Sequence, residues 1–208
     1  MSESPQAQAR RSAFTLFAFA VVCTAVLGAT HALTAGRVKA NEAAARRALI
    51  GQTLPAGSFD NDLVAEAHPL SAQDAESLGR DDGARVYVAR LAGKTTGYVF
   101  EAAARNGYGG RIELLVGLST DGAVSGVRVV SHKETPGLGD YIDSDKSAWP
   151  GQFLGRRDET DKAWKVKKDG GHFDAPAGAT ISARAVTGAL GRVAHYWREH
   201  ATQLKTLP

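Results

Sequence analysis

The feature that most constrains this chain is an uncharged, apolar run near its N-terminus, residues 13–35, AFTLFAFAVVCTAVLGATHALTA. A helix needs roughly 20 such residues to cross the ~30 Å hydrocarbon core of a membrane. The apolar run of a secretory signal peptide is shorter, at roughly 7–15 residues. A buried, alanine-rich core helix is the remaining alternative. We expect a single transmembrane helix over residues 13–35, preceded by a short tail, residues 1–12.

The basic residues beside this run do not settle its orientation. Arg10 and Arg11 precede it, and Arg37, Lys39, Arg46 and Arg47 follow it. The richer C-terminal flank favours a cytoplasmic main domain by the positive-inside rule. However, a first helix with a short basic tail often inserts with that tail inside, and long domains cross largely regardless of charge. Both orientations stay open on charge alone.

Residues 36–83 combine an alanine-rich helical start with prolines, glycines and aspartates, which predicts a linker with short helical pieces such as SAQDAES. From residue 84 the apolar pattern alternates. Four segments separated by turn residues predict antiparallel strands: ARVYVARLA, YVFEAA, RIELLVGL and AVSGVRVVSH. The segment AWKVKK is a candidate fifth strand at an edge, with its lysines in solvent.

The last element is predicted to be an amphipathic helix. Its apolar residues recur at helical spacing: Val186, Leu190, Val193, Trp197 and Leu204. A sheet with segregated helices defines an α+β domain, which we place at residues 84–208.

The amino-acid composition argues against several classes of function. The net charge is +3 and aromatic residues make up 7% without alternating with lysine and arginine, so a nucleic-acid surface is not expected. The single cysteine, Cys23, excludes an internal disulfide or a cysteine cluster, and no HExxH zinc motif occurs. We expect no metal site and no catalytic side chain. Chemistry must then come from a bound group, a hydroxyl or a carboxylate.

Two segments rich in small residues are candidate binding loops: SHKETPGLGDYI, residues 131–142, and FDAPAGATISARAV, residues 173–186. Gly137 and Gly139 let bare backbone approach another group. Thr180 falls in the first turn of the last helix, where unsatisfied N–H groups favour an anion such as phosphate. An ordinary threonine N-cap explains the same residue. The segment lacks the lysine of a Walker motif, and no GxSxG hydrolase elbow is present.

These two segments carry a resemblance to a known family. GYGGRIELLVGLSTDGAVSGVRVVSHKETPGLGD followed by DAPAGATISARAV resembles the G subunit of the Rnf/Rsx membrane electron-transport complex. It is similar, more distantly, to the C subunit of the sodium-pumping NADH:quinone reductase. In such proteins the threonine that ends the motif Asp-x-x-(Ser/Thr)-Gly-Ala-Thr carries FMN through a phosphoester. The matching residues here are Asp174, Gly178, Ala179 and Thr180, while Ala177 departs from the usual Ser or Thr.

The resemblance also implies a flavin-facing loop, with Glu134, Thr135, Gly137, Leu138 and Gly139 as its residues. Tyr108 and Leu138 are candidates for apolar contact with the flavin ring. Glu134 could adjust the flavin electrostatically, as could Lys133, although either charge could equally be solvated and idle.

At the level of the complex, the resemblance implies a redox subunit that carries electrons on covalent FMN, in ferredoxin/NAD-type transfer coupled to ion translocation. Its partners would be the other subunits, membrane lipid and a flavin transferase. Its place would be the bacterial inner membrane, with the flavin domain on the periplasmic side. Two alternatives stay open: a flavin-bearing subunit of the sodium-pumping NADH:quinone reductase, and a membrane-anchored assembly protein without cofactor.

Overall fold

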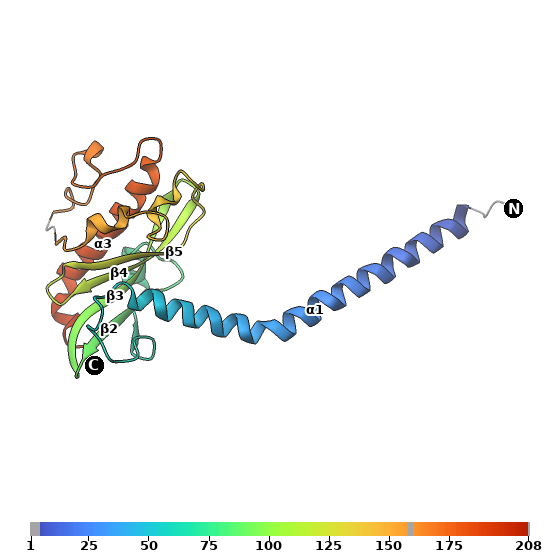
Figure 1. Ribbon diagram of the computed structural model, residues 1–208, viewed down its shortest axis with the longest axis horizontal. Helices are drawn as coiled ribbons and strands as arrows, with labels where there is room; N and C mark the ends of the chain where they lie inside the picture. Colours follow the sequence, from blue (N-terminus) through green and yellow to red (C-terminus); the bar gives the residue numbers. More distant parts are fainter. Residues whose placement is uncertain (1–4, 158–159, 208) are drawn as a thin grey trace. The chain divides into compact units, whose positions relative to one another are not determined.

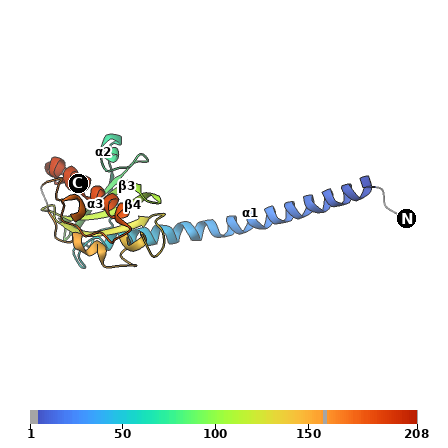
Figure 2. The same cartoon turned by 90° about the horizontal axis from the view of Figure 1, so that it is seen from above.

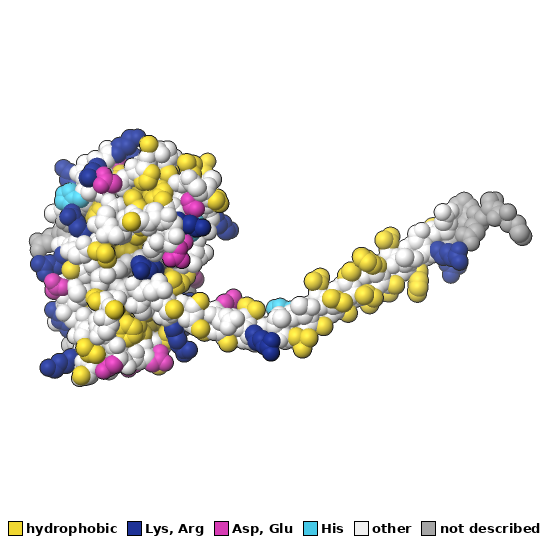
Figure 3. Space-filling view, viewed as in Figure 1, with side chains coloured by type: hydrophobic (Ala, Val, Ile, Leu, Met, Phe, Trp, Pro, Cys, Tyr) yellow, Lys and Arg dark blue, Asp and Glu magenta, His cyan; other side chains and the backbone are white. Residues whose placement is uncertain are grey.

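The protein, described here from a computed structural model that covers residues 5–157 and 160–207, divides into two compact units, Met1–Arg46 and Arg47–Pro208. The N-terminal helix α1 spans Pro5–Gly51 (Figure 1). It is long and apolar enough to cross a membrane, and its apolar window is not buried by protein. Large apolar side chains, Phe14 and Phe17 among them, are exposed on this helix. Figure 3 shows hydrophobic side chains along it.

Helix α1 therefore contains the expected span, residues 13–35, within a longer helix. It continues to Gly51 because the segment after the span, GRVKANEAAARRALIG, is rich in the strong helix formers alanine, arginine and glutamate.

The second unit is built on a five-stranded antiparallel sheet (Figure 1). Its strands are β1 (Ala67–Pro69), β2 (Arg85–Leu91), β3 (Lys94–Gly107), β4 (Gly110–Ser119) and β5 (Val124–Ser131). Their spatial order is β1-β2-β3-β4-β5, so each strand pairs with its neighbour in sequence. The four strands expected from alternation are confirmed, and the domain is α+β.

The turn between β2 and β3 is tighter than the sequence suggests. Leu91 pairs directly with Lys94, which leaves Ala92 and Gly93 as a two-residue loop. Both have positive φ angles, 49° and 75°, as a type I′ turn requires. The residues after Gly93 that resemble a turn, KTTG, form the start of β3 instead.

The final helix, α3 (Thr180–Leu204), packs on one face of the sheet (Figures 1 and 2). The predicted stripe of Val186, Leu190, Val193, Trp197 and Leu204 is buried there. Phe100, fully buried on β3, belongs to the same apolar cluster, and Tyr98 packs its ring 5.0 Å from that of Trp197. The opposite face carries a smaller cluster, in which Ile50, Leu54 and Leu63 cover β-strand residues.

Residues 36–83 are not a separate linker. The compact unit begins at Arg47, and this segment supplies core residues, the edge strand β1 and the helix α2 (Ala72–Ser77). The expected helix start at SAQDAES is confirmed, since Ser71 accepts the Asp74 N–H at 3.1 Å as N-cap.

The expectation of an edge strand at AWKVKK is wrong. Val166 forms only an isolated bridge with Phe173, and a 3-10 helix, η3 (Lys167–Asp169), follows at once. Trp164 and Val166 are both buried, so this segment is held by side-chain packing and not by strand pairing. The edge of the sheet next to β2 is occupied by β1.

Candidate functional site

The two segments rich in small residues meet at one pocket of about 140 Å³. Its lining comes from the β3–β4 turn, the loop after β5 and the start of α3: Tyr108, Glu134, Thr135, Leu138, Gly139, Gly178, Ala179, Ile181 and Ser182. The fold thus brings together most of the residues expected at a flavin site. Ile181 and Ser182 were not expected there. The sequence signal that could have identified them was their position directly after Thr180 in the predicted helix.

The start of α3 forms one wall of the pocket. Gly178 has a φ of +83°, a conformation that favours glycine over residues with a Cβ. Ala179 is the N-cap and offers no side-chain hydrogen bond to the first-turn N–H groups. Its carbonyl accepts a hydrogen bond from the Tyr141 hydroxyl at 2.8 Å. The turn is therefore fixed from the carbonyl side, and its amides are left without a side-chain cap.

Thr180 is the first residue of α3, beside the pocket but outside its lining. It is not the N-cap, so the capping explanation for this residue does not hold. Its side chain is partly exposed, and no hydrogen bond from its hydroxyl is found within residues 5–157 and 160–207.

Glu134 lies at the base of the pocket and is only 4% exposed. One carboxylate oxygen accepts the Gly109 N–H at 2.9 Å, and the other accepts the Ser182 hydroxyl. A Cβ on Gly139 would come within 3.0 Å of both Glu134 Oε2 and Ser182 Oγ, which explains the glycine there. Glu134 thus joins the β3–β4 turn, the loop after β5 and the start of α3.

The rim of the pocket is apolar and open to solvent. Tyr108 is 70% exposed, Leu138 51% and Ile181 46%. Gly137, with a φ of +74°, turns the loop after β5 and donates its N–H to Asp140 Oδ1 at 2.8 Å. Gly137 shapes the loop without lining the pocket, and Lys133 is exposed outside it.

Comparison with known proteins assigns the chain to a protein family. A family model described as FMN-binding domain matches residues 107–195, and one described as RnfG N-terminal region matches residues 1–53. The G subunit of the ion-translocating oxidoreductase complex of Shewanella baltica (strain OS223) is 41% identical over 95% of this chain and 93% of its own length. The chain belongs to the RnfG family. The proteins of the same name from Aliivibrio fischeri (strain MJ11) and Pseudomonas aeruginosa (strain UCBPP-PA14) are each 40% identical, over 96% and 93% of this chain and 95% and 91% of their own lengths.

The match to the FMN-binding domain covers every residue that lines the pocket. The residues of this RnfG-family chain fit FMN chemically. The first turn of α3 has amides without a side-chain cap and contributes no acidic side chain of its own, which suits a phosphate. The exposed apolar rim of Tyr108, Leu138 and Ile181 suits a planar aromatic ring.

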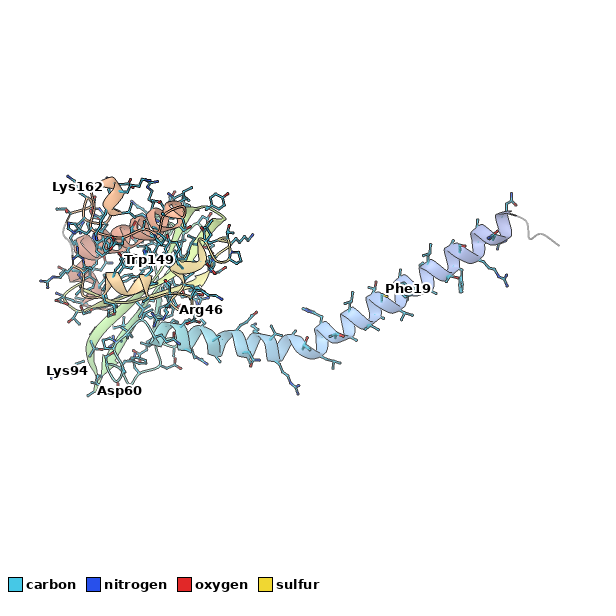
Figure 4. The ribbon with its side chains drawn as sticks, turned by 45° about the horizontal axis from the view of Figure 1, so that its top comes forward. Phe19, Arg46, Asp60, Lys94, Trp149 and Lys162 are labelled. Carbon is cyan, nitrogen blue, oxygen red and sulfur yellow. The ribbon has the colours of Figure 1, made fainter. Side chains whose placement is uncertain are left out.

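Asp174 lies apart from the pocket lining. Its carboxylate pairs with Lys167 Nζ at 2.8 Å, and its N–H donates to Gln152 Oε1 at 2.7 Å. Its carbonyl accepts the indole N–H of Trp149, the residue labelled in Figure 4, at 2.7 Å. In this structure Asp174 therefore fixes the loop that leads into α3.

A larger cavity of about 550 Å³ lies between α3 and the segment 161–169. Its lining includes Trp164, Arg184 and Arg192, and none of the residues expected to contact flavin. Burial, followed by the charge of Arg105, lowers the pKa of Arg192. This cavity is larger than the pocket beside Thr180, but none of the residues expected to contact flavin lines it. Its size alone is therefore no reason to place the flavin there.

Proposed function

We propose that this subunit carries electrons on FMN attached by a phosphoester to Thr180. The observation that carries the proposal is the Thr180 hydroxyl: partly exposed, without a hydrogen-bond partner among the described residues, and placed in the uncapped first turn of α3 beside the pocket. The flavin supplies the electron chemistry when bound, and the protein holds and orients it.

The neighbouring hydroxyls are less suited to attachment. Ser182 is 1% exposed and donates to the Glu134 carboxylate, so its oxygen is inaccessible. Thr135 is exposed and lines the pocket, but it belongs to the loop after β5 and not to the first turn of α3. Thr180 combines access with a helix N-terminus, where a phosphate gains roughly 0.3–1 kcal/mol from the dipole and up to ~2 when partly buried.

The pocket size supports a pose in which the flavin is only partly enclosed. At about 140 Å³ it is smaller than the roughly 300–1,000 Å³ that encloses a ligand of this size. We infer that Gly178, Ala179 and Gly139 adjoin the phosphate and sugar chain, while the ring rests on the exposed side chains of Tyr108, Leu138 and Ile181. Thr135 and Gly137 shape the adjoining loop, and Asp174 presents the acceptor turn to a flavin transferase.

The relatives are named as the G subunit of an ion-translocating oxidoreductase complex, which supports a role in a multi-subunit membrane assembly. We propose that α1 anchors the chain in the lipid of the bacterial inner membrane and that the flavin domain lies on the periplasmic side. Electrons would pass in ferredoxin/NAD-type transfer coupled to ion movement.

The attachment is tested by intact mass of the full chain co-expressed with a bacterial flavin transferase. The wild type is expected to gain the mass of one FMN less one water, on the peptide that contains Thr180. Thr180→Ala is expected to stay colourless, whereas Thr135→Ala and Thr180→Ser, which keep a hydroxyl at residue 180, are expected to be flavinylated. A flavinylated Thr180→Ala protein would refute attachment at this residue.

The side of the membrane is tested with a cysteine at Lys94, an exposed residue at the β2–β3 turn that Figure 4 labels. Cys23, the single native cysteine, is first changed to serine. We expect a membrane-impermeant maleimide to label Lys94→Cys in cells whose outer membrane alone is permeabilised. Labelling only after the inner membrane is broken would place the domain in the cytoplasm.

A further inference from the structure

Glu134 is a buried carboxylate, only 4% exposed. Within the part of the chain that the structure describes, no lysine, arginine or histidine forms an ion pair with it, and the ring of the neighbouring His132 accepts the Glu134 backbone N–H at 3.1 Å. Its two oxygens accept hydrogen bonds from a backbone amide and a serine hydroxyl, both neutral donors. Burying a charge is costly unless it is paired, and a glutamine fills nearly the same volume. The charge itself therefore requires an explanation beyond packing.

The charge lies at the flavin pocket. Glu134 is part of the pocket lining, and Ser182, which it binds, is in the first turn of α3 two residues after Thr180. The Glu134 charge also acts on Tyr141, which contacts the turn before Thr180. Burial is the main cause that raises the pKa of Tyr141 to about 12, and the Glu134 charge is a further cause. Tyr141 in turn binds the Ala179 carbonyl.

We propose that Glu134 tunes the flavin by holding a fixed negative charge in the lining of the pocket, beneath the rim on which the ring rests. This inference depends on the attachment of FMN at Thr180. Complete reduction of a flavin takes up two electrons; with two protons the reduced ring is neutral, and with one it is an anion. A neighbouring carboxylate disfavours the anion, since like charges in a low dielectric repel strongly. Glu134 therefore lowers the midpoint potential and favours uptake of the second proton.

The chain offers a control at a second buried glutamate, which lies outside the pocket. Glu101 on β3 is 5% exposed and also accepts a hydroxyl hydrogen bond, from Tyr87. Tyr87 belongs to the apolar cluster on the sheet face opposite α3, and Glu101 does not line the flavin pocket. Glu101→Gln removes the same charge from a similarly buried site without altering the pocket.

The test is a potentiometric titration of the flavinylated full chain in detergent, with dithionite as reductant and redox mediators, between pH 6 and 9. Glu134→Gln is expected to raise the midpoint potential. It should also lower the pH at which the potential changes from a two-proton to a one-proton dependence. Glu101→Gln and Glu134→Asp, which keeps the charge, should behave as wild type.

Ser182→Ala separates charge from positioning, because it removes a hydrogen bond and keeps the carboxylate. If the midpoint potential of Ser182→Ala rises as much as that of Glu134→Gln, the proposal is overturned. An unchanged midpoint potential in flavinylated Glu134→Gln would also overturn it. If Glu134→Gln does not fold, carbon-13 NMR of the Glu134 carboxyl in Thr180→Ala protein remains decisive, since a protonated group at pH 7 would refute the fixed charge. Absence of FMN from wild-type Thr180 would instead refute the proposed function.

Discussion

Two glycines in α3 allow the packing of the helix to be tested with one substitution at two positions. A Cβ added at Gly188 would meet nothing closer than Arg192 Nη1 at 4.0 Å. A Cβ added at Gly191 would lie 2.8 Å from Trp164 Cβ and 3.2 Å from Trp164 Cγ. The Trp164 Cβ is bonded to the backbone, so side-chain rotation cannot move it away.

In a helix interior, alanine is more favourable than glycine by roughly 0.8–1.0 kcal/mol. Gly188→Ala is therefore expected to raise the free energy of unfolding by about 1 kcal/mol. Gly191→Ala gains the same propensity but overpacks the contact with Trp164, which costs typically about 1–3 kcal/mol. Its net effect is expected to lie between about zero and a loss of ~2 kcal/mol, so the two variants should differ by about 1–3 kcal/mol.

The assay is urea unfolding of the full chain in detergent, followed by tryptophan fluorescence. The three tryptophans, Trp149, Trp164 and Trp197, all lie in the unit Arg47–Pro208, so the signal reports this unit and not the unit Met1–Arg46. Thermal unfolding should shift by about 2–4 °C per kcal/mol for a domain of this size. A Gly191→Ala protein as stable as Gly188→Ala would refute the close packing of Trp164 on α3.

Ala92, with a φ of 49° in the two-residue β2–β3 turn, is replaced by asparagine, which tolerates this conformation better. Ala92→Asn is expected to stabilise the protein by up to about 1 kcal/mol in urea unfolding, and a destabilised variant would contradict the turn geometry. Tyr141→Phe loses the hydrogen bond to Ala179 and should cost about 1 kcal/mol at neutral pH. Because burial raises the pKa of Tyr141 from 10.0 to about 12, the folded state keeps this proton while the unfolded state loses it, so stability falls as pH rises from 10 to 12. Urea midpoints from pH 8 to 11 should fall less steeply in Tyr141→Phe than in wild type, and equal slopes would show that Tyr141 is not the titrating group.

The sequence predicts those parts of the fold that follow from local periodicity. Alternation located β2 to β5, and the apolar stripe from Val186 to Leu204 located α3, because each signal extends over several residues of one element. β1 has only three residues, Ala67–Pro69, which is too short to show a period. Its position as a strand depends on pairing with β2, a tertiary effect.

The site shows the same division. The small residues around Thr180 and the loop from Glu134 to Gly139 were recognisable from sequence, and the fold brings them to one pocket. The hydrogen bond between Ser182 and Glu134 joins residues 48 positions apart, and no local pattern encodes it. Asp174 was expected at the flavin site from its place in a motif. Its actual partners, Lys167, Gln152 and Trp149, come from other parts of the chain.

The strand order has a consequence for biosynthesis. Since every strand pairs with the one made just before it, the sheet can assemble progressively as the polypeptide leaves the ribosome or the translocon. Thr180 belongs to the last helix, and the turn around it is held by Tyr141 and Glu134, made much earlier. An intact turn before Thr180 therefore requires that synthesis has reached α3 and that the helix has docked. A modifying enzyme that requires this turn would act on finished molecules and pass over nascent or truncated ones.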